Sequence, residues 1–298
     1  MEWWLVLSFI FLALMSLMVT GIPVAMTFMT INIIGLFWIA GGIEGLASIS
    51  GSVFLGTSTF NLLAVPMFFL LGAVLFHAGI IQLVMEVTNV WVGKVRARLL
   101  FVSLFSGTGL AMLSGAGTAD TALIASTLYP EMEKQGYHRN LSLGTIVSSG
   151  LLAAIIPPSS LAVLLGSLAE VNIGALLLAG LGPGLMMVTI YIIYVSIRVA
   201  LNPSLAPTYP SDSVALKKKL LMTLQITPLG LIIFMVMGFI LLGITTPSEA
   251  AVTGALGAMI VTALYGRLTV RTMKLALSSV VRVFGMFFLI IAGAISFG

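Results

Sequence analysis

Long apolar runs constrain this chain more than any other feature of its sequence. Most of them are close to the roughly 18–20 residues that an α-helix needs to cross the hydrocarbon core of a bilayer. Only 7% of the 298 residues are charged and 60% are hydrophobic, whereas a soluble domain carries about 25% charged residues. The sequence therefore predicts an all-α polytopic membrane protein. The runs cover Trp3–Thr20, Pro23–Ala40, Phe60–His77, Leu99–Leu113, Thr118–Tyr129, Leu141–Leu168, Ile173–Ala200, Leu220–Leu242, Ser248–Tyr265 and Val283 to the C-terminus.

The polar residues exclude several classes of function. Cysteine is absent, which rules out disulfides and thiolate metal sites. The net charge of +4 is spread over short loops, so we interpret it as orienting charge and expect no nucleic-acid partner. The sequence contains no recognisable nucleophile–base pair, P-loop or metal cluster. An intramembrane enzyme built on Asp120 would need a second ionisable group at membrane depth, which we do not find, so we expect no enzymatic role.

Two halves of the sequence resemble each other. "GIPVAMTFM" starts at Gly21 and "GITTPSEAAV" at Gly243; downstream, "MFFLLGAVLF" starts at Met67 and "MFFLIIAGAISF" at Met286. The two pairs have nearly equal spacing, although chance similarity among apolar segments is the alternative. The polar linker Asn202–Lys219 separates the halves.

Charge indicates that the two copies are inverted. Gly41–Thr59, after the first proline-led run, contains no Lys or Arg, whereas its counterpart carries Arg267, Arg271 and Lys274. Positive charge near membrane ends marks the cytoplasmic side, so the matched segments would face opposite sides, as in inverted-repeat transporters. The sequence ends soon after Met286, so we expect that the second repeat is incomplete and that the polypeptide is truncated at its C-terminal end.

The segment Leu99–Tyr129 predicts a re-entrant helical hairpin. Two apolar legs of about 15 and 12 residues surround "LSGAGTADTA" at Leu113–Ala122, and basic residues flank both outer ends. Each leg is short for a full span. Both feet would then be cytoplasmic, with the tip at mid-membrane. Two ordinary short spans joined by a small-residue turn are the alternative.

The hairpin tip carries the groups expected of an ion or substrate site. Gly115 and Gly117 permit a turn and a close approach, while Ser114 and Thr118 offer hydroxyl oxygens. Exposed backbone at membrane depth is tolerated where it is buried in protein or lines a cavity. Asp120 is a functional candidate because buried charge in a membrane is costly, but it equally fits a stabilising role at a helix N-terminus.

A double proline predicts a discontinuous helix within Leu141–Leu168. Proline removes a backbone hydrogen bond, and hydrocarbon offers no water to replace it, so "IIPPSS" frees carbonyls beside two serines. Such breaks form midplane sites in transporters, and their oxygens suit a hard cation such as sodium; a packing kink without a ligand is the alternative. The candidate ion- and substrate-binding residues are Ser114, Gly115, Gly117, Thr118, Asp120, Ser148, Ser149, Pro157, Pro158, Ser159 and Ser160. A sodium ion would lie near Ser114, Gly115, Thr118, Pro157 and Ser159.

Two other ionisable residues favour structural roles. "TPSE" at Thr246–Glu249 predicts a capping box with proline at the first helical position. His77 lies near the end of an apolar run and is expected at the membrane interface.

Three segments together resemble one protein family. "SGAGTADTALIASTLYPEMEKQGY" from Ser114, "IIPPSSLAVLLGSLAEVNIGALLLAGLGPGLM" from Ile155 and "GITTPSEAAV" from Gly243 closely resemble the large membrane subunit of tripartite ATP-independent periplasmic (TRAP) transporters. The resemblance covers essentially the whole sequence in order. Two departures are visible: Ala116 replaces a serine usual in the family hairpin, and the family's second hairpin and second broken helix are absent.

The resemblance implies a function and a domain organisation. It implies a sodium-coupled, elevator-type importer of organic acids (a C4-dicarboxylate, sialic acid or another sugar acid). The partners would be a periplasmic substrate-binding protein and a small four-helix membrane subunit, in the inner (cytoplasmic) membrane of a bacterium or archaeon. No cofactor is implied beyond sodium as the coupling ion. A related anion carrier that works without a binding protein is the alternative. Because most of the second repeat is missing from this polypeptide, it is not expected to transport by itself.

The resemblance also implies a division of the chain into four parts. They are the scaffold helices and arm of the first repeat (1–93), the transport-domain hairpin and broken helix (94–172), the connecting helix and cytoplasmic linker (173–219) and the truncated scaffold helices of the second repeat (220–298).

Overall fold

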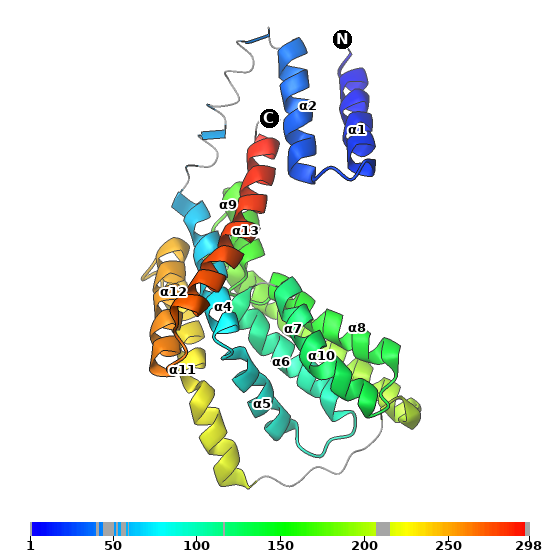
Figure 1. The fold of residues 1–298 in the computed structure, drawn as a ribbon, viewed down its shortest axis with the longest axis vertical. Helices are drawn as coiled ribbons and strands as arrows, with labels where there is room; N and C mark the ends of the chain where they lie inside the picture. The colour runs from blue at the N-terminus through cyan, green and yellow to red at the C-terminus, as the bar shows by residue number, and fades with distance from the viewer. Residues whose placement is uncertain are drawn as a thin grey trace. The chain divides into compact units, whose positions relative to one another are not determined.

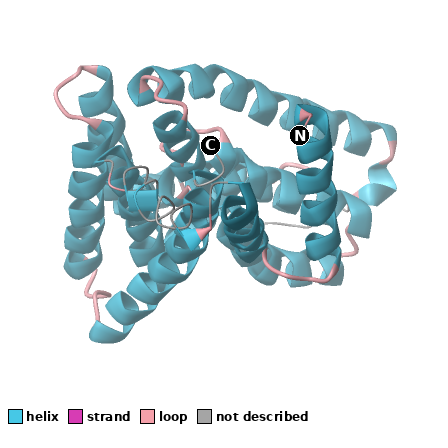
Figure 2. Cartoon of the chain, turned by 90° about the horizontal axis from the view of Figure 1, so that it is seen from above, coloured by secondary structure: helices cyan, strands magenta, loops and turns pink. Residues whose placement is uncertain are grey.

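The computed structural model of the protein describes residues 2–39, 42–43, 51, 53–54, 58, 60–115, 117–206 and 215–295. Within these ranges the regular elements are helices, as Figure 2 shows. The α-helices are α1 (Trp3–Val19), α2 (Val24–Ile39), α4 (Ala64–His77), α5 (Ile81–Val92), α6 (Arg98–Ser114), α7 (Gly117–Lys134), α8 (Arg139–Leu151), α9 (Ser160–Leu168), α10 (Ile173–Leu201), α11 (Leu216–Leu241), α12 (Pro247–Leu264) and α13 (Val270–Ile295). Three short 3₁₀ turns accompany them: η1 (Phe60–Leu63), η2 (Leu152–Ala154) and η3 (Pro203–Leu205).

The helices confirm the prediction of an all-α polytopic membrane protein. Among the described residues, α10, α11, α12 and α13 are each long and apolar enough to cross a membrane. The pair α4 and α5 bends by 70° and adds a fifth candidate if it counts as one broken span. The capping box at Thr246 is also confirmed: its hydroxyl accepts from the Glu249 N–H at 3.3 Å, and the Glu249 carboxylate accepts from the Thr246 N–H at 2.8 Å.

The protein forms two compact units. The first comprises residues 1–62 and 279–298, with α1, α2 and the last part of α13. In this unit Asn32 donates from Nδ2 to the carbonyl of Gly293 at 2.6 Å. A Cβ at position 293 would lie 2.9 Å from the Cβ of Phe28, so α13 approaches α2 closely because Gly293 has no side chain.

The second unit, residues 63–278, contains the predicted hairpin and broken helix. On one side α12 packs against α4 and α11: a Cβ on Gly254 would lie within 2.8 Å of Leu71 and Val236. On the other side α6, α7, α8 and α10 lie together (Figure 1). A buried cluster there surrounds the helix break and comprises Ala111, Leu152, Ala153, Ile156 and Val188.

Several predicted boundaries differ from the observed ones. The hairpin legs are longer than expected, at 17 and 18 residues, because α7 continues through Pro130 into charged residues. α5 was not predicted at all, since polar residues interrupt its apolar pattern. α13 starts at Val270, well before the apolar run at Val283. Most of the first-half arm Gly41–Thr59 and much of the linker Asn202–Lys219 lie outside the described residues, so the inverted orientation of the repeats stays a prediction.

Candidate functional site

The predicted hairpin contains a tight turn between α6 and α7. α6 ends at Ser114, and Gly115 follows with a left-handed φ of 58° while its N–H donates to the carbonyl of Ala111 at 3.3 Å. α7 begins at Gly117. A left-handed residue strains any side chain with a Cβ, so this turn favours glycine at position 115. Ala116, the position of the missing family serine, lies outside the described residues.

The predicted discontinuous helix is also present. α8 runs to Leu151 and passes through the short turn η2, and α9 starts at Ser160. The Pro157–Pro158 peptide between them is cis. Ser159 bridges the break, because its hydroxyl donates to the carbonyl of Ala154 at 2.9 Å and accepts from the N–H of Ala162 at 3.2 Å. The Ser159 hydroxyl therefore already serves as the N-cap of α9.

The hairpin turn and the helix break lie against each other. A Cβ on Gly115 would lie 2.8 Å from the hydroxyl oxygen of Ser160 and 3.3 Å from the carbonyl oxygen of Pro158. One step along, a Cβ on Gly117 would lie 2.6 Å from the carbonyl oxygen of Gly150. The approach of α6 and α7 to the broken helix thus depends on glycines at both points.

Ser160 brings an unused oxygen to this contact. Its side chain is 1% exposed, and its hydroxyl forms no hydrogen bond with any residue that the structure describes. A buried polar group without a partner costs roughly 1–3 kcal/mol. The Ser160 hydroxyl and the Pro158 carbonyl both lie close to Gly115, so this contact contains a buried oxygen whose hydrogen bonding the described residues do not satisfy.

Three helix ends meet at this point. The C-terminus of α6 leaves carbonyls without intrahelical donors and carries partial negative charge, which favours a cation. The N-termini of α7 and α9 carry partial positive charge, which favours an anion. In the described part of the protein, no group of three or more His, Cys, Asp or Glu could hold a metal. Besides the Asp120 carboxyl in the first turn of α7, the oxygens at these helix ends are hydroxyl and carbonyl oxygens, which discontinuous helices use to bind ions in transporters.

Asp120 lies in the first turn of α7 and is completely buried. This position places its carboxyl near the positive end of the helix, which agrees with the interpretation that Asp120 stabilises the helix N-terminus. Burial of the only acidic side chain in the turn also agrees with the functional reading. Both readings therefore stay open.

The side chains of three other predicted site residues, Ser149, Ser148 and Thr118, are directed elsewhere. The Ser149 hydroxyl points to α6, where it lies 3.4 Å from the Ser103 hydroxyl and donates to the carbonyl of Ile146 at 2.8 Å. Ser148, the next residue back, lines a separate cavity. The Thr118 side chain is exposed. Of the predicted residues, the structure brings Gly115 against Pro158 and Ser160, while Gly117 packs against Gly150 and Ala153.

Sequence reasoning missed the glycines that make the close packing possible. A Cβ on Gly150 would overlap the hydroxyl of Thr121, and α10 packs against the break through two further glycines. A Cβ on Gly180 would lie 2.6 Å from the carbonyl oxygen of Ile155, and one on Gly184 would lie 2.7 Å from Cγ1 of Ile156. The four-residue spacing of Gly180 and Gly184 is the signal that could have identified this helix contact.

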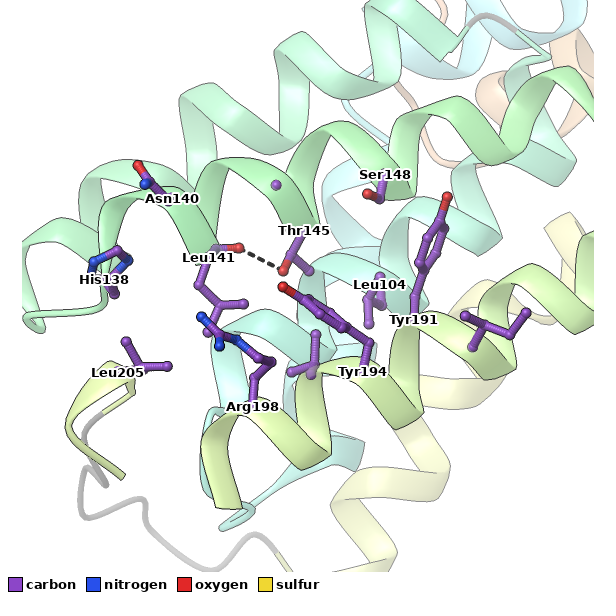
Figure 3. Close-up of a pocket in the computed structure, with 13 residues that line it drawn as sticks. Leu104, His138, Asn140, Leu141, Thr145, Ser148, Tyr191, Tyr194, Arg198 and Leu205 are labelled. Carbon is purple, nitrogen blue, oxygen red and sulfur yellow. Dashed lines mark hydrogen bonds between the residues drawn. The ribbon is translucent and has the colours of Figure 1, made fainter. Parts of the chain in front are cut away.

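The cavity lined by Ser148 lies between α8 and α10 (Figure 3) and has a volume of about 510 Å³. Arg198, His138 and two tyrosines contribute to its wall.

Comparison with known proteins adds a family relationship. Residues 11–298 match the family described as the tripartite ATP-independent periplasmic transporter, DctM component. The ectoine TRAP transporter large permease protein TeaC of Halomonas elongata is 30% identical over 247 residues, which cover 83% of this chain and 57% of that protein. The C4-dicarboxylate TRAP transporter large permease protein DctM of Vibrio cholerae is 28% identical over 83% of this chain and 54% of its own length.

A third similar protein is the 2,3-diketo-L-gulonate TRAP transporter large permease protein YiaN of Escherichia coli. It is 31% identical over 56% of this chain and 39% of its own length. The relatives are permease proteins rather than enzymes, as the sequence predicts for this protein. The matched region spans little more than half of the length of the first two relatives.

Proposed function

We propose a transport role from one premise: the chain belongs to the DctM-component family of tripartite ATP-independent periplasmic transporters. In this proposal it is the large membrane subunit, or the larger part of it, of a sodium-coupled importer of small organic acids. The relatives' names mention ectoine, C4-dicarboxylates and 2,3-diketo-L-gulonate, which supports a small, soluble, oxygen-rich substrate class.

The observation that carries the proposal is the contact between the hairpin turn and the broken helix. The Ser160 hydroxyl is buried and unsatisfied by the described residues, and it lies against Gly115 at the carbonyl-bearing end of α6. A sodium ion bound by this hydroxyl and by backbone carbonyls would satisfy these oxygens without any carboxylate ligand. The positive ends of α7 and α9 next to it favour a substrate carboxylate.

The proposed mechanism is an elevator-type movement. The hairpin and the broken helix belong to one compact unit and pack through glycines, so they would move together as a body. Bound sodium would fill the oxygens of the turn and make the site ready for an organic anion. The partners in the proposal are a periplasmic substrate-binding protein and a small four-helix membrane subunit, and the chain itself would lie in the inner membrane.

The test is sodium-driven uptake into proteoliposomes by the natural protein that contains this sequence, reconstituted with its binding protein and small subunit. We expect uptake to require a sodium gradient and Ser160→Ala to reduce it at least tenfold. Ser196→Ala is the matched control, because its exposed hydroxyl bonds to the carbonyl of Ile192 on its own helix, and it should transport normally. Sodium-independent uptake that survives Ser160→Ala would refute the proposal. Uptake without the binding protein would favour the alternative carrier class.

A further inference from the structure

The cavity between α8 and α10 is distinct from the proposed ion site. Residues from both helices line it, with single contributions from α6 and η3. The lining residues are Leu104, His138, Asn140, Leu141, Gly144, Thr145, Ser148, Ile190, Tyr191, Tyr194, Val195, Arg198 and Leu205. At about 510 Å³ the cavity is far larger than an ion needs, so its occupant would be molecular in size.

The charge of the lining favours an anion. Arg198 is the one permanently charged residue among the lining residues, and none of them is an acid. Figure 3 shows its guanidinium directed from α10 toward Leu141 and His138. His138 is the N-cap residue of α8, and its side chain forms no capping hydrogen bond. The first N–H groups of α8 therefore lack a side-chain cap at the same end of the cavity, where helix geometry favours negative charge.

The rest of the cavity is apolar, and it continues onto an apolar helix surface. Leucine, isoleucine and valine side chains form much of the wall. Along α10, on the side of Tyr191 that is away from Arg198, the side chains of Ile190 and Met186 are 49% and 65% exposed. α10 is one of the candidate membrane spans, so this surface would face hydrocarbon.

Two tyrosines stand between the charged and the apolar parts. Tyr191 and Tyr194 project from α10 into the space beside α8 (Figure 3). Tyrosine is typical of the membrane–water boundary, because its ring is apolar and its hydroxyl is polar. From Arg198 toward the N-terminus of α10 the order is thus a cation, then the phenol groups of Tyr194 and Tyr191, then the exposed apolar side chains of Ile190 and Met186.

We propose that this cavity binds an anionic phospholipid, with its phosphate at Arg198 and the N-terminus of α8 and an acyl tail along α10. A small soluble anion could use the cationic end but would leave the apolar wall in water. A zwitterionic lipid would gain less from Arg198. The proposal concerns a different site from the proposed sodium site and does not depend on transport.

The experiment is native mass spectrometry of the purified protein with added lipid. Phosphatidylglycerol and phosphatidylcholine with identical acyl tails are compared, and glycerol 3-phosphate serves as the headgroup without a tail. We expect severalfold more phosphatidylglycerol retained than phosphatidylcholine, since one basic residue near a membrane surface corresponds to about fivefold in binding. Glycerol 3-phosphate should not displace the lipid at equal concentration.

Three variants locate the binding. Arg198→Gln should lower phosphatidylglycerol retention about fivefold, toward that of phosphatidylcholine. Gly144→Leu should lower it as well, because this exposed glycine lines the cavity, has no described atom within 4 Å of its missing Cβ, and leaves every charge in place. Arg271→Gln is the control: Arg271 is an exposed arginine on α13, outside the cavity, and its loss should leave retention unchanged.

The outcomes that overturn the proposal are equally definite. Equal retention of the two lipids, or no effect of Arg198→Gln, would show that Arg198 does not select an acidic headgroup. An effect of Arg198→Gln without an effect of Gly144→Leu would place the lipid on the charged surface and not in the cavity. Displacement by glycerol 3-phosphate would identify a site for a soluble anion.

Discussion

The two faces of α8 differ in how closely neighbouring helices pack against them. Ser149 points into the glycine-lined packing against α6, and α8 then leads into the break where Ser160 has its unsatisfied hydroxyl. Ser148, one residue earlier, faces the open cavity with Arg198. Close backbone packing leaves room for an ion at most, whereas the cavity has room for a molecule.

The difference follows from side-chain size rather than from polarity. Both faces carry serines, but glycines bring backbone against backbone on the first face, and long side chains of α10 hold the second face open. The comparison predicts that substitutions on the packed face change stability, the response to sodium, or both, while those on the open face leave both nearly unchanged. Four predictions test this, in order of decreasing effect.

Gly150→Ala should give the largest effect. The added Cβ would overlap the Thr121 hydroxyl and lie 2.9 Å from the carbonyl oxygen of Gly117, and backbone cannot move away cheaply. Overpacking of this kind costs about 3 kcal/mol at the upper end of its usual range. Thermal unfolding in detergent measures the loss. Gly144→Ala on the same helix is the control, since no described atom lies within 4 Å of its missing Cβ; if both variants unfold alike, the packed-face argument fails.

Ser160→Ala should act in opposite directions with and without sodium. Removal of an unsatisfied buried hydroxyl should stabilise the sodium-free protein by about 1–2 kcal/mol. The same change should abolish stabilisation by sodium, which for the unmodified protein should reach about 1.4 kcal/mol at ten times the dissociation constant. Unfolding temperatures in sodium and in potassium chloride at equal ionic strength measure both effects. A sodium response that persists in Ser160→Ala would exclude this hydroxyl as a ligand.

Local sequence patterns were sufficient to predict the elements of the packed face. Glycines between two apolar legs indicated the turn at Gly115, and adjacent prolines indicated the break before Ser160; both features lie within a few residues of the predicted positions. α5 could not be predicted from apolar runs, because Gln82, Glu86 and Asn89 interrupt its apolar pattern.

The direction in which each side chain of α8 points could not be predicted from the sequence. Ser148 and Ser149 are adjacent and chemically identical, and a helix turns about 100° between them, so their partners depend on which neighbours pack where. The need for glycine at positions 150 and 180 could not be predicted for the same reason. It arises from contacts with Thr121 and Ile155, which are distant in sequence. Close packing therefore has to be observed, even where the elements that pack are predictable.

Ser159→Ala distinguishes structural from ligand oxygens at the break. The Ser159 hydroxyl already bonds to Ala154 and Ala162, so its removal should cost about 1 kcal/mol, as for other N-cap residues. Since those bonds occupy it, the sodium response should persist, in contrast with Ser160→Ala. The same paired salt measurements test this. Loss of the sodium response in Ser159→Ala without loss in Ser160→Ala would reverse the assignment of the two serines.

Ser148→Ala should have the smallest effect, and that makes it a sharp test of the open face. Its side chain lines the cavity and is only partly buried, so the free energy of unfolding should change by less than about 0.5 kcal/mol. Its sodium response should equal that of the unmodified protein, although the sequence alone placed Ser148 among the ion-binding candidates. A change in the sodium response of Ser148→Ala would mean that the ion site extends around α8 into the cavity, and the separation of the two faces would then be wrong.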